Sequence, residues 1–121
     1  MEILKCLEKF EVVKDYEVLS FKTFYDGFYI KIKVFLSNGS ILYIREYVDS
    51  NERNYSYHWQ NEKGELIIRW DNAPHHKEIK TYPHHKHIAE KVFESFEITC
   101  EKILEVIELE IKKQNLQNKE L

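Results

Sequence analysis

The sequence predicts one α+β domain, in which an antiparallel β-sheet meander of about five to six strands carries a short N-terminal helix and a long C-terminal helix on one face. Residues 17–72 alternate in polarity and contain two hairpin turn signals, Asp26-Gly27 and Asn38-Gly39. Helical spacing of apolar residues occurs near the two ends of the chain. The 121 residues, 43% of them hydrophobic, can bury one core, so residues 1–121 are interpreted as a single domain.

The two helices are predicted from apolar stripes. Residues 2–10 carry Ile3, Leu4, Leu7 and Phe10 at helical spacing. Near the other end, Thr99 is a suitable N-cap residue. The stripe that follows it consists of Cys100, Ile103, Leu104, Ile107 and Ile111. The polar tail, residues 115–121, is expected to be frayed.

Strand alternation assigns side chains to the two faces of the sheet. Between Tyr29 and Val34 the aliphatic residues point to the core, so Lys31 and Lys33 point outward. A two-residue loop at the second turn would bury Arg45, whereas a three-residue loop at residues 38–40 would place it on the outer face. We favour the three-residue loop, because burial of an unpaired charged side chain costs several kcal/mol.

The last predicted hairpin turns at residues 61–64. It places His58 diagonal to Arg69 on the outer face of the sheet, close enough for both side chains to contact one ligand. Its inner face is predicted to pair large apolar residues, Trp59 with Leu66, Tyr57 with Ile68, and Tyr55 with Trp70.

Composition excludes several classes of protein. The formal net charge of −3 argues against a strongly basic nucleic-acid-binding domain, although a local basic face remains compatible with it. No run of 18 apolar residues occurs, and the N-terminus lacks the pattern of a signal peptide. The two cysteines form no CxxC pattern. We therefore expect a cytoplasmic protein with no membrane partner.

Five of the six histidines lie between residues 75 and 87, which makes this segment the candidate functional site. The tetrapeptide Pro-His-His-Lys occurs twice, at residues 74–77 and 83–86, and His87 follows the second copy. The prolines indicate a loop or an edge segment. Functional residues concentrate in such segments when a rigid scaffold holds them.

Metal-independent cleavage of RNA is the leading hypothesis for this segment, with no cofactor. Histidine titrates near neutral pH and can act as general acid or base, while arginine and lysine bind phosphate. The expected catalytic residues are His58, Arg69, His75, His76, His84 and His85. The residues expected to bind RNA are Lys31, Lys33, Arg45, Lys77, Lys86 and His87. Asp71 is expected to orient a histidine or to cap the turn that follows it.

Three alternatives remain open. The histidines could shape a non-catalytic interface for RNA or protein, or they could simply pack and hydrogen-bond. Metal binding is the third, but the spacing matches no standard ligand motif. If residues 76–84 were extended, the two histidine clusters would lie up to roughly 26 Å apart. Only a turn near Lys80-Thr81 would bring them together, so no metal ligands are assigned.

The sequence also resembles the TumE-like family of small toxins from prokaryotic toxin–antitoxin pairs. The resemblance rests on Trp70-Asp71-Asn72-Ala73-Pro74-His75-His76 and Pro83-His84-His85-Lys86-His87, and it is strongest over residues 55–87. It implies a cytoplasmic toxin that a cognate antitoxin neutralises, typically a helix-turn-helix protein encoded beside it. The expected partners are RNA, this antitoxin and, as a further option, a second copy of the chain. The resemblance assigns no catalytic roles.

Overall fold

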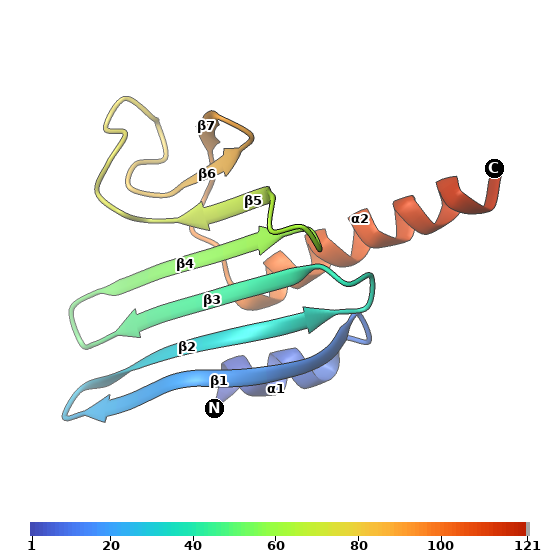
Figure 1. Ribbon diagram of the computed structural model, residues 1–121. Coiled ribbons are helices and arrows are strands. Elements are labelled where there is room, and N and C mark those ends of the chain that lie inside the picture. Colours follow the sequence, from blue (N-terminus) through green and yellow to red (C-terminus); the bar gives the residue numbers. More distant parts are fainter. Residues whose placement is uncertain (121) are drawn as a thin grey trace.

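The computed structural model describes residues 1–120 and consists of one seven-stranded antiparallel sheet and two helices (Figure 1). The strands are neighbours in the sheet in the same order as in the sequence, so the sheet is a simple meander. The elements are α1 (Glu2–Lys9), β1 (Val13–Phe24), β2 (Gly27–Leu36), β3 (Ile41–Val48), β4 (Arg53–Gln60), β5 (Leu66–Asp71), β6 (His85–Ile88), β7 (Lys91–Glu94) and α2 (Cys100–Glu120).

Both helices contribute to a core on one face of the sheet, as the sequence predicts. The apolar stripe of α2 packs on the inward residues of the central strands, and Ile103, Leu104 and Ile107 are fully buried there. The N-cap prediction for α2 is confirmed, because the hydroxyl of Thr99 accepts a hydrogen bond of 3.3 Å from the backbone N–H of Lys102. The opposite face of the sheet carries no helix and is therefore available to a ligand.

Helix α2 is longer than the apolar stripe that predicts it. The helix continues through the polar residues from 115 and ends at Glu120, whereas Leu121 lies outside the described residues. This stretch contains neither glycine nor proline, so the helix has no residue that would stop it. Within residues 1–120, neither helix combines the length and the apolar character needed to cross a membrane.

The sheet has seven strands, more than the five to six predicted, because β6 and β7 extend it beyond β5. Their connecting turn is Ala89-Glu90, and Ala89 adopts a left-handed conformation with φ of 55°. That conformation is normally supplied by glycine or asparagine, so this hairpin has no residue signature. The prediction of a loop or edge segment therefore missed that His85 and His87 lie on a strand.

The predicted pairing of the last meander hairpin is shifted by two residues. Trp59 lies opposite Ile68 and Tyr57 opposite Trp70, with a bulge between Trp59 and Gln60. A bulge inserts an extra residue into one strand, and neither the alternation of polar and apolar residues nor the loop length indicates where it occurs. Because the shift is even, every residue stays on its predicted face, and His58 now lies directly opposite Arg69 rather than diagonal to it.

Candidate functional site

Two rows of polar side chains cross the helix-free face of the sheet. Directly paired residues share a face, so the pairing of strands β2 to β6 builds each row one residue at a time. The first row is Lys33, Tyr43, His58, Arg69 and His87. The second row is Lys31, Arg45, Ser56, Asp71 and His85. Residues distant in the sequence thus meet on one surface.

A cleft of about 770 Å³ opens where the two rows reach the histidine-rich segment. A shallower hollow of about 400 Å³ adjoins it around His58, and Arg45 and Arg69 line both. The residues lining the cleft are Tyr29, Arg45, Tyr47, Glu52, Asn54, Tyr55, Arg69, Asp71, Asn72, Ala73, Pro74, His75, His76, His85 and His87. Cationic, aromatic and imidazole side chains therefore face the same space.

The segment between the two Pro-His-His-Lys copies folds into consecutive turns. Backbone N–H groups donate from Ile79 to the carbonyl of His76 (3.1 Å), from Tyr82 to that of Ile79 (3.0 Å) and from His84 to that of Thr81 (2.9 Å). The chain therefore reverses near Lys80-Thr81, the one arrangement that brings the two copies together. The ring centroid of His76 lies 5.1 Å from that of His85 and 5.6 Å from that of His87.

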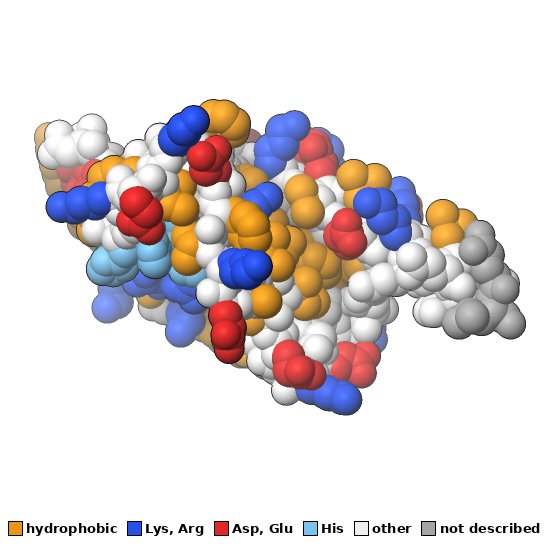
Figure 2. Space-filling model, turned by 90° about the horizontal axis from the view of Figure 1, so that it is seen from above, with side chains coloured by type: hydrophobic (Ala, Val, Ile, Leu, Met, Phe, Trp, Pro, Cys, Tyr) orange, Lys and Arg blue, Asp and Glu red, His pale blue; other side chains and the backbone are white. Residues whose placement is uncertain are grey.

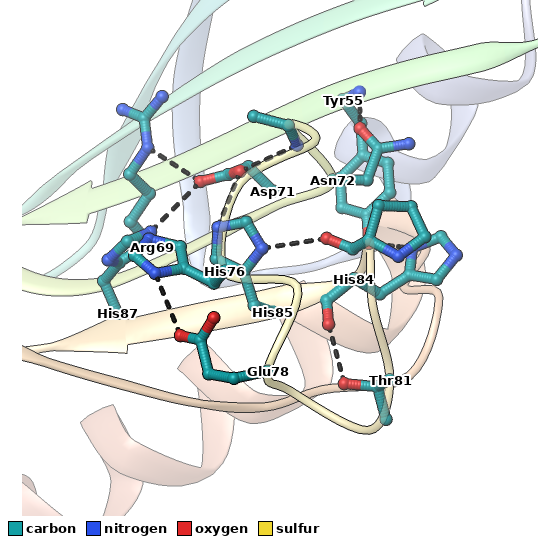
Figure 3. Close-up of polar contacts among 12 residues, drawn as sticks. Tyr55, Arg69, Asp71, Asn72, His76, Glu78, Thr81, His84, His85 and His87 are labelled. Carbon is teal, nitrogen blue, oxygen red and sulfur yellow. Dashed lines mark hydrogen bonds and ion pairs between the residues drawn. The ribbon is translucent and has the colours of Figure 1, made fainter.

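Asp71 connects the arginine to the histidines (Figure 3). Its Oδ2 accepts a hydrogen bond from Nε of Arg69 at 3.2 Å and lies 3.5 Å from Nε2 of His87. Its Oδ1 lies 3.0 Å from Nε2 of His85 and accepts another from the backbone N–H of Ala73 at 3.0 Å. This carboxylate is buried, and the geometry supports both predicted roles, orienting histidines and capping the turn.

Replacement of Asp71 by alanine should therefore lower the free energy of unfolding by about 1–3 kcal/mol, because the N–H of Ala73 and the Nε of Arg69 lose their acceptor. Urea unfolding followed by circular dichroism measures this change. The control is Glu65→Ala, which removes an exposed carboxylate from the β4–β5 loop. An unfolding midpoint equal to that of the unsubstituted protein would show that Asp71 does not hold the loop.

His58 lies next to Arg69 on strand β4, on the side away from His87, and its environment is unusual. Its Nδ1 is buried and has no hydrogen-bond partner among the described residues. Burial is the main factor that lowers the pKa of His58, and the positive charge of Arg69 lowers it further. His58 also lines the adjoining hollow, where a neutral imidazole can accept a proton from a ligand.

His87 borders Arg69 on the side opposite His58, and its pKa is also lowered. Burial is again the main cause, and the Asp71 carboxylate opposes it. Sequence analysis assigned His87 to RNA binding, but its place in the first row makes it equivalent to His58 with respect to Arg69. The position of His87 beside Arg69 depends on strand β6, and the sequence did not predict this strand.

Four of the residues predicted for the site line neither the cleft nor the adjoining hollow. The Nδ1 of His84 is 2.9 Å from the hydroxyl of Tyr55, and the two rings stack, which is a packing role. Lys86 lies opposite Trp70, on the face that carries the helices. Lys33 and Lys77 line neither the cleft nor the adjoining hollow. His75 does line the cleft, and it is exposed.

Two tyrosines complete the site in a way that residue motifs alone do not indicate. Tyr29 and Tyr47 are paired across strands β2 and β3 and line the cleft beside Arg45. Strand alternation predicts that both tyrosines lie on the outer face of the sheet. That face borders a cleft only because the segment between the two Pro-His-His-Lys copies folds beside it. Figure 2 shows the histidines gathered at one side of the molecule next to lysine and arginine side chains. The cleft itself is lined by two arginines, Arg45 and Arg69, and two carboxylates, Glu52 and Asp71, and Lys31 adds a third cation in the adjoining hollow.

A comparison with protein-family models supports the resemblance seen in the sequence. The family model of the toxin TumE matches residues 3–114, which is nearly the whole chain. The chain belongs to the TumE toxin family. Membership in the TumE family indicates a toxin role and an antitoxin partner. The match also extends beyond residues 55–87, where the resemblance in the sequence is strongest, to the N-terminal 50 residues.

The other two comparisons gave no match. Neither the curated proteins nor the solved structures include one that matches this chain. The chemistry of this TumE family member is therefore argued from its own geometry.

Proposed function

We propose that this toxin acts by cleaving RNA in the cleft, as an endoribonuclease that needs no metal. The observation that carries the proposal is the position of Arg69 between His58 and His87 in one row across the sheet. Adjacent strands are spaced by about 4.8 Å, so the two histidines lie on strands roughly 10 Å apart with the guanidinium between them. A phosphate bound to Arg69 would therefore have an imidazole on each side.

The reaction follows from this arrangement. His58 removes the proton from the ribose 2′-hydroxyl, and the 2′-oxygen forms a bond to phosphorus. The bond from phosphorus to the 5′-oxygen breaks, and a histidine on the other side of Arg69, His87 in this geometry, gives that oxygen a proton. The products are a 2′,3′-cyclic phosphate and a free 5′-hydroxyl. Arg69 stabilises the extra negative charge on phosphorus.

The remaining cleft residues suit a single-stranded RNA. Arg45 and Lys31 provide further cations for neighbouring phosphates, and Tyr29 and Tyr47 offer rings on which bases can stack. His75, His76 and His85 surround the cleft and support the position of the RNA or of His87. An RNA target places the toxin's action in the cytoplasm.

The proposal also includes the type of antitoxin that neutralises the toxin. A helix-turn-helix antitoxin is proposed on the family resemblance alone, and a homodimer of the toxin stays a prediction. The structure contains a single chain.

Incubation of purified, untagged protein with total RNA and with tRNA tests the proposal. The reactions run at about pH 6 to 8, around the ordinary pKa of histidine, with EDTA in one set and magnesium chloride in the other. We expect cleavage in both sets and 2′,3′-cyclic phosphate ends on the products. RNA that stays intact in both sets would overturn the proposal.

The same cleft also supports a second candidate function, binding RNA without cleaving it, because Arg45 and the two tyrosines need no proton transfer to hold a strand. Growth assays of expressed variants separate the two. Toxicity that survives alanine at His58 and His87 but falls after replacement of Lys31 and Arg45 would favour binding over catalysis.

A further inference from the structure

Three histidines at one end of the cleft form a compact cluster of ring nitrogens. His76, His85 and His87 each offer one nitrogen, and these three atoms lie within 4.8 Å of one another. The centroids of the His85 and His87 rings are 4.9 Å apart. His85 and His87 project from the same face of strand β6, and His76 comes from the turn that closes over it (Figure 3). The spacing of these histidines along the sequence had argued against their nitrogens lying so close together.

The hydrogen bonds of His85 prepare it to bind a cation. Its Nδ1 is 2.8 Å from the backbone carbonyl oxygen of Pro83, which can only accept, so Nδ1 carries a proton. The Nε2 of the same ring faces Oδ1 of Asp71 at 3.0 Å, and this carboxylate also accepts from Arg69. The lone pair of Nε2 then faces a carboxylate oxygen inside the protein, since the side chain of His85 is only 2% exposed. A cation beside Nε2 would be attracted by both atoms.

The surroundings match those of metal-binding histidines in other proteins. A histidine that binds a metal through one nitrogen commonly donates the proton on the other to a backbone carbonyl, and carboxylates stand next to such sites. Here the carbonyl of Pro83 and the carboxylate of Asp71 occupy these two places. His76 is held with φ of 59°, a conformation that a residue other than glycine adopts only where the surrounding structure imposes it. Its ring lies against those of His85 and His87.

We propose that His76, His85 and His87 bind one divalent transition-metal ion of the zinc class. Imidazole nitrogen suits such ions, and a Zn–N bond of about 2.1 Å in tetrahedral geometry sets the nitrogens about 3.4 Å apart. The three nitrogens would have to draw together from their present spacing, which rotation of the exposed ends of His76 and His87 allows. All three residues line the cleft, so the open fourth position of the ion faces it.

The bound ion has a consequence for RNA cleavage, and this consequence rests on the proposed function. An ion on the ring nitrogen of His87 occupies the lone pair that would carry the proton to the leaving oxygen. Zinc should therefore suppress cleavage while the metal-free form cleaves. Binding of the ion itself needs no RNA and stands apart from the cleavage hypothesis.

Isothermal titration of metal-depleted, untagged protein with zinc chloride tests the site. We expect one ion per chain and a higher melting temperature in the presence of zinc. Loss of a neighbouring group that merely supports a metal ligand costs about 10–100-fold in affinity, so loss of a ligand should cost at least about 100-fold. The variants are His87→Ala and His76→Gly, and glycine at residue 76 also suits the positive φ. The control is His75→Ala, which removes an exposed histidine outside the cluster.

A second measurement uses the unsubstituted protein, in case a variant fails to fold. Nitrogen NMR of the imidazole rings should show that zinc shifts the signals of His76, His85 and His87 and leaves those of His58 and His84 in place. No saturable binding, equal affinity in all variants, or shifts confined to His75 and His84 would each overturn the proposal. Since neither measurement contains RNA, failure here leaves the cleavage proposal standing, and intact RNA in the cleavage assay leaves the metal site standing.

Discussion

Replacement of Arg69 by alanine should slow RNA cleavage by about 10²–10³-fold, the loss typical for removal of one group that stabilises transition-state charge. The guanidinium of Arg69 lies between His58 and His87. Arg45 also lines the cleft and the adjoining hollow, but it lies in the second row and not between the two histidines. Single-turnover cleavage of a short RNA measures the effect. Arg69→Lys should recover part of the rate, because lysine keeps the charge but loses the planar pair of donors.

Lys14→Ala is the matched control for Arg69, since it removes a cation from β1, the edge strand farthest from the histidines. It should cleave at the normal rate. Thermal unfolding of each variant separates loss of the site from loss of the fold. A folded Arg69→Ala protein that cleaves as fast as Lys14→Ala would contradict a phosphate-binding role for Arg69.

Replacement of His58 by alanine should reduce cleavage by about 10²–10⁴-fold, the range for loss of a general base or acid. Burial and Arg69 lower the pKa of His58 from the ordinary value of 6.5, so the ring is neutral at pH 7 and able to accept a proton. Below its lowered pKa the ring gains a proton and cannot act as a base. The rate should therefore fall on the acid side with a midpoint below pH 6.5, and pH–rate profiles measure it.

Gln60→Ala tests whether the effect at His58 comes from proton transfer. Gln60 is on the same strand and lines the same hollow, but it cannot take up a proton near neutral pH. We expect at most a small change in rate, and an acid limb that moves toward lower pH, because the hydrogen bond of Gln60 raises the pKa of His58. Equal losses in the two variants would assign His58 to shape or RNA binding instead of to proton transfer.

Much of the fold follows from periodic patterns in the sequence. The alternation around Ile30 and Ile32 fixed the inner face of β2, and the four-residue spacing of Ile103 and Ile107 located the helix that covers it. These patterns are local and strong, because burial of one face selects them. For the same reason Lys31 and Arg45 were correctly placed on the outer face, which became the side of the cleft.

The other parts of the fold and of the site could not be predicted, because they depend on backbone features that no residue type indicates. The bulge beside Trp59 moved the partner of His58 by two positions, and Ala89 forms a turn that usually requires glycine or asparagine. The reversal between His76 and His84 depends on three backbone hydrogen bonds, none of which has a side-chain signature. Sequence analysis therefore found the histidine segment but could not tell that His84 packs on Tyr55 while His76 joins His85 and His87.

Cleavage of an RNA oligonucleotide with a single 2′-deoxynucleotide at the mapped cleavage site tests the central claim most directly. The claim is that groups on this face of the sheet activate the 2′-hydroxyl next to a phosphate bound at Arg69. We predict that, in EDTA, the all-ribose strand is cut to a 2′,3′-cyclic phosphate and the substituted strand stays intact at that position. Cleavage of both strands at the same rate would contradict the claim.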